Sequence, residues 1–208
     1  MPSQGFQPDA AATPVGSSHD RILAAAKQLF ASRGYENTST VAIARLAGTS
    51  ESQLMKHFGS KEGLLEAIFD QGWEKMSFAL RSIQELSAPG EKLLSLLDLM
   101  LKAFERDPEL KELMLLEGRR VRKEGHMVLL TRGYLEFVKT VDSLLLEIRA
   151  AGELRPDANP QAIRSGLIGM LEGLLRDQML ARRINYPASY STAEIRGLFT
   201  SVLGAMRP

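Results

Sequence analysis

The chain has 208 residues, of which 44% are hydrophobic and 25% are charged, ordinary values for a globular protein with a sizeable core. Cysteine is absent, which excludes disulfides and thiolate metal sites, and the three histidines lie far apart, so we predict no metal site and no cofactor. The formal net charge is +1, so any binding of nucleic acid must come from a local patch and not from the whole chain.

The first 17 residues are rich in Pro, Gly, Ser, Gln and Ala, which predicts a flexible tail. They lack the basic and apolar regions of a secretory signal, and they contain no Lys or Arg with which an arm could enter a DNA minor groove. No run of about 20 uncharged apolar residues occurs in the chain, so we expect no membrane-spanning segment and a cytoplasmic protein.

The region after the tail has the pattern of three short amphipathic helices. They are expected at about His19–Arg33, 40–47 and 51–57. Gly48 can adopt the left-handed conformation that ends a helix, and Ser50 can cap the helix that follows. Two helices joined by a short turn that contains glycine form a helix-turn-helix, whose second helix fits the major groove of DNA. We therefore predict that this region binds DNA.

The second helix of the motif carries the residues that we expect to touch DNA. Leu54 and Phe58 face inward, and the exposed positions are Glu51, Ser52, Gln53, Met55, Lys56 and His57. Glutamine can pair with adenine and lysine with guanine, so Gln53 and Lys56 are the best candidates for reading bases. Hydroxyls, lysines and helix N-termini contact phosphates, and the candidates are Ser39, Thr40 and Lys61. An exposed polar face of a short helix would look the same without any contact to DNA.

The rest of the chain is helical in pattern. Ser60 can cap a long helix from Lys61 to about Leu86, which is long enough to carry movement across the protein. Further helices are expected at about Glu91–Glu105, from Pro108, and at His126–Ala151, Asn159–Arg183 and Thr192–Met206. No segment alternates as a strand does, so we predict an all-α fold of about nine helices, with a domain boundary near Ala67.

Residues 22–69 closely resemble the DNA-binding domain of the TetR family of transcriptional regulators. The resemblance rests on Leu29-Phe30, Arg33-Gly34-Tyr35, Thr38-Ser39, Ile43-Ala44, Ala47-Gly48, Ser50, Leu54, Phe58, Ser60-Lys61-Glu62 and Leu64-Leu65. It covers less than a quarter of the chain. It implies a three-helix DNA-binding domain over residues 18–66 and a ligand-binding and dimerisation domain over residues 67–208. It also implies a homodimer that binds a palindromic double-stranded operator, usually as a repressor, and that a small molecule releases.

Several positions depart from the family pattern, including Thr40, where an apolar residue is often found, and Val41 and Ala42, where charged residues are frequent. Tyrosine is common where Met55 stands, and its ring and hydroxyl usually pack on the DNA backbone. Threonine is common where Gln53 stands, and valine where Thr49 stands. Gln53 indicates a different base preference. Because the unit carries few positive charges, we expect only a modest dependence of DNA binding on salt.

A ligand pocket should be an apolar cavity with a few polar groups. The large, adaptable side chains that could line one are Trp73, Met76, Met100, Phe104, Met114 and Tyr134. Core packing alone also explains all of them. Glu172 and Arg176 lie four residues apart and are expected to form a surface pair. The basic run at 119–123 is expected to be a solvated helix end, although it could instead orient an anionic ligand.

The last two helices carry apolar residues that predict a four-helix dimer interface. These residues are Ile163, Leu167, Met170, Leu174, Ile195, Phe199 and Val202. Glycines at 166, 169 and 173 would each weaken a helix by about 1 kcal/mol, which close packing against a neighbour would offset. The alternative is that these residues pack within one subunit.

Two other classes of function remain open at this point. An all-helical enzyme built on paired carboxylates is one, although the chain has no glycine-rich phosphate loop and no metal-ligand spacing. A helical adaptor or ligand sensor that kept the motif but does not bind DNA is the other, and Met55 and the low charge permit it. An activator is a further variant of the regulator.

Overall fold

The computed structural model of the chain describes residues 16–80, 83, 88–121 and 127–208. Within these ranges the fold is all-helical, with nine helices and no strand, as the sequence predicts. In chain order the helices are α1 (Ser18–Arg33), α2 (Thr40–Leu46), α3 (Glu51–Phe58), α4 (Lys61–Leu80), α5 (Pro89–Arg106), α6 (Pro108–Glu117), α7 (Arg132–Ala150), α8 (Pro160–Ile184) and α9 (Thr192–Ala205).

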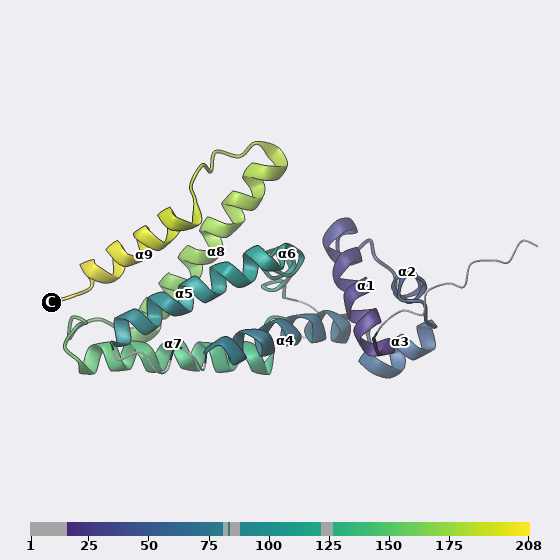
Figure 1. Ribbon diagram of the computed structural model, residues 1–208, viewed down its shortest axis with the longest axis horizontal. Coiled ribbons are helices and arrows are strands. Elements are labelled where there is room, and N and C mark those ends of the chain that lie inside the picture. Colours follow the sequence, from purple (N-terminus) through teal and green to yellow (C-terminus); the bar gives the residue numbers. More distant parts are fainter. Residues whose placement is uncertain (1–15, 81–82, 84–87, 122–126) are drawn as a thin grey trace, which may run out of the picture.

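Helices α1 to α3 gather at one end of the molecule, and α4 runs from them into the larger helical body (Figure 1). Serine side chains begin all four of these helices by accepting a hydrogen bond from a backbone N–H, and they are Ser17, Ser39, Ser50 and Ser60. The helices enclose a core whose side chains are almost completely buried, including Ile22, Ile43, Leu54, Leu64 and Leu65. This unit is rigidly packed, and its outer helices are held at a fixed angle.

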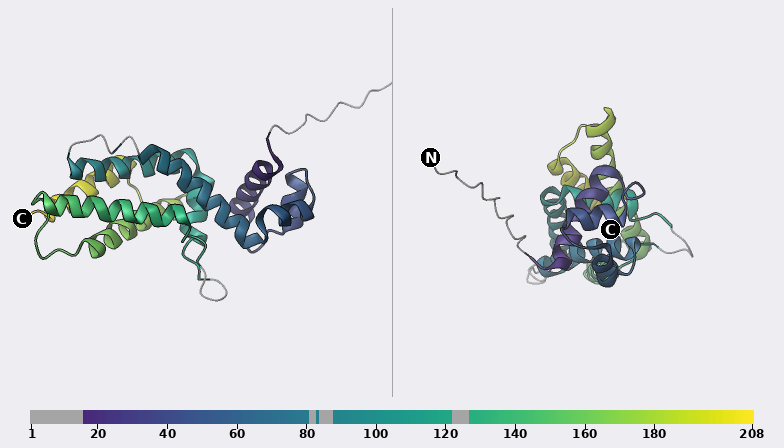
Figure 2. Two further views of the ribbon diagram at one scale, coloured as in Figure 1. Left: turned by 90° about the horizontal axis from the view of Figure 1, so that it is seen from below. Right: turned by 90° about the vertical axis from the view of Figure 1, so that its right-hand side faces the viewer.

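The larger body consists of the second half of α4 together with α5, α7, α8 and α9 (Figures 1 and 2). Helix α7 packs along both α4 and α5, and α8 and α9 cover the other side of α5 and α7. Gly133 allows α7 to approach α4 closely, since a Cβ atom there would lie 2.4 Å from the Cβ atom of Trp73. One continuous apolar core joins these five helices.

Helix α6 lies at the junction of the two parts and packs on α1, α4 and α8. Leu113 of α6 and Val128 of the following loop belong to the core of the small unit, whereas Leu129 belongs to the core of the larger body. The ammonium of Lys27 on α1 lies 2.6 Å from a carboxylate oxygen of Asp107, which caps α6. A shift of α6 would therefore change the packing of both cores.

The start of one long helix differs from the expectation, and the end of another is only partly described. Helix α7 begins at Arg132 and not at His126, because Thr131 caps it and residues 127–130 form a turn. That turn lets the adjacent side chains of Val128 and Leu129 enter different cores, which one continuous helix would prevent. Helix α4 is described to Leu80, and most of its expected last turn, residues 81–82 and 84–87, lies outside the described residues, as does most of the predicted tail.

Candidate functional site

The helix-turn-helix is formed by α2 and α3, with Gly48 between them at a φ of 61°, the left-handed conformation that the turn requires. Leu54 is completely buried beneath α3. The residues of α3 that we predicted to touch DNA are all exposed, and they are Glu51, Ser52, Gln53, Met55, Lys56 and His57. Val41 on α2 is also exposed, at 48%.

Two of the exposed residues on α3 are held by neighbours. The hydroxyl of Thr40 donates a hydrogen bond to the carboxylate of Glu51. The Nε2 atom of His57 lies 2.9 Å from the hydroxyl of Ser18 on α1. By contrast, no hydrogen bond or ion pair to the described residues holds the side chains of Gln53 and Lys56. Those two side chains are therefore the ones most able to reorient toward a base edge.

The predicted phosphate contacts lie on either side of this surface. The Oγ atom of Ser39 accepts from the N–H of Ala42, which leaves its own hydroxyl proton available to donate. The ammonium of Lys61 lies 4.2 Å from the centre of the Tyr35 ring, a cation–π contact that fixes its position at the start of α4. Both residues thus flank α3 with groups able to donate to a phosphate.

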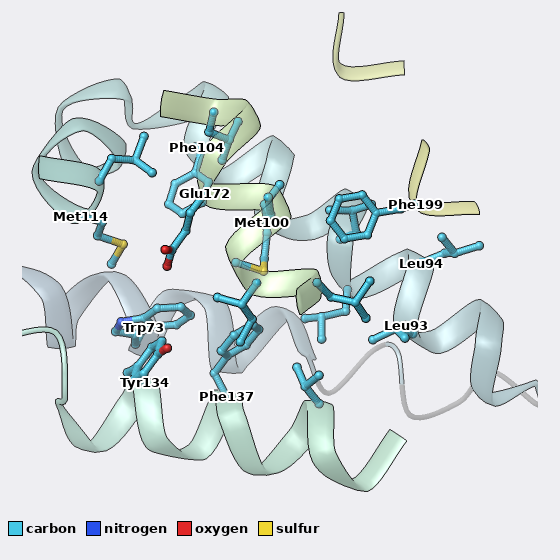
Figure 3. Close-up of a pocket in the computed structure, with 18 of the residues that line it drawn as sticks. Trp73, Leu93, Leu94, Met100, Phe104, Met114, Tyr134, Phe137, Glu172 and Phe199 are labelled. Atoms are coloured by element: carbon cyan, nitrogen blue, oxygen red, sulfur yellow. The ribbon is translucent and has the colours of Figure 1, made fainter. Parts of the chain in front are cut away.

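An apolar cavity of about 80 Å³ lies inside the larger body, between α4, α5, α7, α8 and α9 and the end of α6 (Figure 3). Five of the six residues that we predicted to line a pocket do so, namely Trp73, Met100, Phe104, Met114 and Tyr134. Met76 is buried in the surrounding core but does not line the cavity. The volume is far below the roughly 300–1,000 Å³ of ligand sites, so a bound molecule must be slender or must widen the cavity.

Polar groups gather at one end of the cavity. Figure 3 shows Trp73, Tyr134 and the carboxylate of Glu172 near Met114, with Leu93, Leu94 and Phe199 at the opposite end. The indole Nε1 of Trp73 is buried and has no hydrogen-bond partner within residues 16–80, 83, 88–121 and 127–208. Burial raises the pKa of Tyr134, so its hydroxyl stays protonated at neutral pH and can donate.

Glu172 is part of an ion pair that the sequence pattern did not reveal. Its two carboxylate oxygens accept from Nε and Nη2 of Arg119, at 2.7 and 2.9 Å, and these hydrogen bonds raise the pKa of Arg119. The expectation that Glu172 pairs with Arg176 is therefore wrong. Arg119, just beyond the end of α6, is about half exposed, and it contacts Glu172 on the cavity wall without lining the cavity itself. Arg122 and Lys123 lie outside the described residues.

Arg120, the next residue along the chain, contacts the helix-turn-helix unit. An Nη1 atom of Arg120 lies 3.2 Å from the carboxylate of Glu117 and 3.6 Å from that of Glu36, in the loop after α1. Consecutive arginines at the end of α6 thus contact the cavity wall on one side and the helix-turn-helix unit on the other.

Comparisons with known proteins agree with this arrangement. The family described as bacterial regulatory proteins, tetR family, matches residues 22–68. The HTH-type transcriptional regulator UidR of Escherichia coli strain K12 is 28% identical over 193 residues, which cover 91% of this chain and 96% of UidR. Residues 22–68 therefore carry the DNA-binding domain of the TetR family. The chain is a transcriptional regulator with a helix-turn-helix, and not an enzyme.

Solved structures share the fold of the chain over nearly its whole length. The fatty acid degradation regulator FadR of Bacillus halodurans superimposes with a TM-score of 0.76 at 24% identity, over 94% of this chain and 99% of FadR. FadR of Bacillus subtilis, solved in complex with stearoyl-CoA, gives a TM-score of 0.74 at 20% identity, over 91% of this chain and all of that one. In the described part of the chain, no helix is both long and apolar enough to cross a membrane.

The predicted dimer residues of this regulator fall into two groups. Leu167, Ile195 and Phe199 are buried inside the subunit, where they pack in its own core. The partly buried residues, which pack at the edge of the core, are Ile163, Met170, Leu174 and Val202. Leu198, on the same helix as Ile195 and Phe199, is 43% exposed.

Proposed function

We propose that the chain is a homodimeric repressor that binds a palindromic operator through α3 and is released by a small molecule in the cavity. The observation that carries the proposal is the position of α6, which touches both the helix-turn-helix unit and the cavity. On this proposal residues 18–66 read DNA and residues 67–208 bind the ligand and the second subunit. The protein would act in the cytoplasm, where it meets its operator.

The exposed surface of α3 supports the DNA-binding part of the proposal. Gln53 and Lys56 would read base edges, and Met55, which is 42% exposed, would contact a thymine methyl group. Ser39 and Lys61 would bind phosphates, and Thr40 would do so once its hydroxyl leaves Glu51. Glu51 and His57, which are held by Thr40 and Ser18, would shape the edges of the surface.

Glycines on the outer face of the last two helices support the homodimer. A Cβ atom added at Gly166, Gly169, Gly173 or Gly197 would meet nothing within 4 Å, so these glycines face open space in the single subunit. Each lowers helix stability by about 1 kcal/mol relative to alanine, and no packing inside the subunit offsets this. Close approach of α8 and α9 to the same helices of a second copy would do so, in a four-helix interface.

The cavity supports release by a small molecule. Met100 and Met114 on its wall can adopt new rotamers, and such flexible side chains let a small cavity widen around a ligand. FadR of Bacillus subtilis, which has the same fold, was solved with stearoyl-CoA. Because α6 contributes Met114 to the cavity and packs on α1, widening would shift α1 and change the spacing of the two recognition helices.

A gel shift with DNA from upstream of the chain's own gene tests the proposal, together with analytical ultracentrifugation of the free protein. We expect a dimer, a symmetric footprint with half-sites about 34–36 Å apart, and a log–log salt slope of order −4 to −6. An intact dimer that binds no DNA at low salt would instead identify an adaptor or sensor. A slope near −10 would reveal a basic surface beyond the residues named above.

A further inference from the structure

A buried donor lies beside the polar end of the cavity. Trp73 is 4% exposed, yet its Nε1–H has no hydrogen-bond partner among the described residues. A buried donor without a partner is costly, and an acceptor on a bound molecule would remove that cost. Among the described residues that line the cavity, no buried acceptor is left unpaired in the same way.

Arg119 adds a positive charge to the same end. A guanidinium has five N–H donors, of which Glu172 accepts from one on Nε and one on Nη2, and Tyr134 also interacts with Arg119, so some donors remain for a ligand. Arg119 and Glu172 neutralise each other, so a ligand anion would compete with Glu172 for the guanidinium. Tyr134 is protonated and lies beside Trp73, with ring centres 5.4 Å apart, so it can also donate.

We propose that the ligand of the repressor described above is an elongated apolar molecule that ends in a hydrogen-bond acceptor, best a carboxylate. Its polar end binds at Trp73, Tyr134 and Arg119, where it competes with Glu172. Its apolar chain extends along α5 toward Leu93, Leu94 and Phe199 (Figure 3). From Phe104 back to Leu93, α5 rises by roughly 16 Å, which suits a chain of medium length.

This arrangement also explains how occupancy reaches the DNA-binding unit. Arg119 is the residue next to Arg120, and Arg120 pairs with Glu36 of that unit. When a ligand acceptor draws Arg119 away from Glu172, the end of α6 is no longer tied to α8. The short segment that contains both arginines then moves with the ligand, and the contact with Glu36 moves with it.

Fluorescence of the full-length dimer tests the proposal without DNA, because Trp73 is the only tryptophan in the chain. The probes are dodecanoate, dodecanol, dodecylammonium, dodecanoyl-CoA and CoA alone. We expect dodecanoate to change the emission of Trp73 and to bind at least about tenfold more tightly than dodecanol, as a charge-assisted hydrogen bond predicts. If dodecanoyl-CoA binds more tightly than dodecanoate and CoA alone causes no change in fluorescence, the ligand still ends in a hydrogen-bond acceptor, and that acceptor is a thioester carbonyl.

Two substitutions separate the roles of the ion pair. Arg119→Gln should remove the preference for dodecanoate over dodecanol, and Arg119→Lys should keep part of it. Glu172→Gln should tighten the binding of dodecanoate by a few-fold, since it removes the competitor while keeping the shape. Arg176→Gln, an exposed change on the same helix, is the matched control and should alter neither affinity. Circular dichroism of each variant confirms that it is folded.

Three results would overturn the proposal. Tightest binding of dodecylammonium, lost in Glu172→Gln, would make Glu172 the anchor of a cationic ligand. Equal affinities for dodecanoate and dodecanol would mean that Arg119 does not recognise the polar end of the ligand. No response of Trp73 to any acyl probe, in a protein that still binds its operator, would reject this ligand class and leave the repressor proposal intact. If the parent protein binds no operator but its fluorescence responds to the probes as expected, the repressor proposal is rejected and the assignment of the ligand class is kept.

Discussion

The two cores of the molecule are packed to different degrees. Of the largest fully buried side chains in the described ranges, all but Leu145 and Ile195 belong to the core of the helix-turn-helix unit. The larger core contains a cavity, methionines on its wall and Trp73, whose N–H has no partner in the part of the chain that the structure describes. Close packing gives one conformation, whereas a cavity with flexible walls gives several of similar energy. A single conformation suits the helix-turn-helix unit, which must fit DNA, and several conformations of similar energy suit the larger body, which must adapt to a ligand.

Equivalent truncations in the two cores give the largest expected effect. Leu54→Ala should lower the free energy of unfolding by about 2–5 kcal/mol, since Leu54 is completely buried in the closely packed unit. Leu97→Ala removes the same atoms from the wall of the cavity and should cost less, because one side of Leu97 already lacks neighbours. Urea denaturation at one fixed protein concentration measures both changes. Equal costs would mean that the two cores are equally tight.

Substitutions on the exposed face of α3 should separate DNA reading from ligand sensing. Gln53→Ala and Lys56→Ala should each weaken operator binding by about 1–3 kcal/mol, because each removes a candidate base contact. Neither should alter the fluorescence of Trp73 or its response to a ligand. Met100→Leu, a change of similar volume on the cavity wall, is the reciprocal control and should affect only ligand binding. If both α3 variants bind the operator like the parent, other residues read the bases.

The contact between Arg120 and Glu36 should matter for communication and little for stability. Both side chains are substantially exposed, so Arg120→Gln should change the free energy of unfolding by less than about 0.5 kcal/mol. It should nevertheless reduce the coupling between ligand and operator by about 0.5–2 kcal/mol, because it removes the link from the end of α6 to the DNA-binding unit. Operator titrations with and without ligand measure the coupling. An unchanged coupling would place the link in Leu113 and the Lys27–Asp107 pair instead.

The same contrast explains what could be predicted from sequence. Local signals define the small unit, since Gly48 and the serine caps act on neighbouring residues and the buried positions follow the helical period. In the larger body the period identifies apolar helices but not their partners, so Leu167 and Phe199 were assigned to the dimer although they line the cavity. The pair of Arg119 and Glu172 joins residues 53 positions apart, and an ion pair of that kind has no periodic signature.

A pH dependence confined to α9 should be the smallest effect. Ser191 and Glu194 form a capping box, in which the backbone N–H of Ser191 and then its hydroxyl lower the pKa of Glu194. A carboxyl whose pKa is lower in the folded state stabilises the protein above its unfolded pKa, and this contribution is lost as the pH falls through the folded value. Thermal unfolding of Glu194→Gln should therefore differ from the parent near neutral pH and converge with it in acid. Because α9 belongs to the larger body and does not touch α3, Glu194→Gln should leave operator binding by an intact dimer unchanged. If the difference in thermal stability between the variant and the parent does not depend on pH, the side chain of Glu194 acts by packing and not by charge.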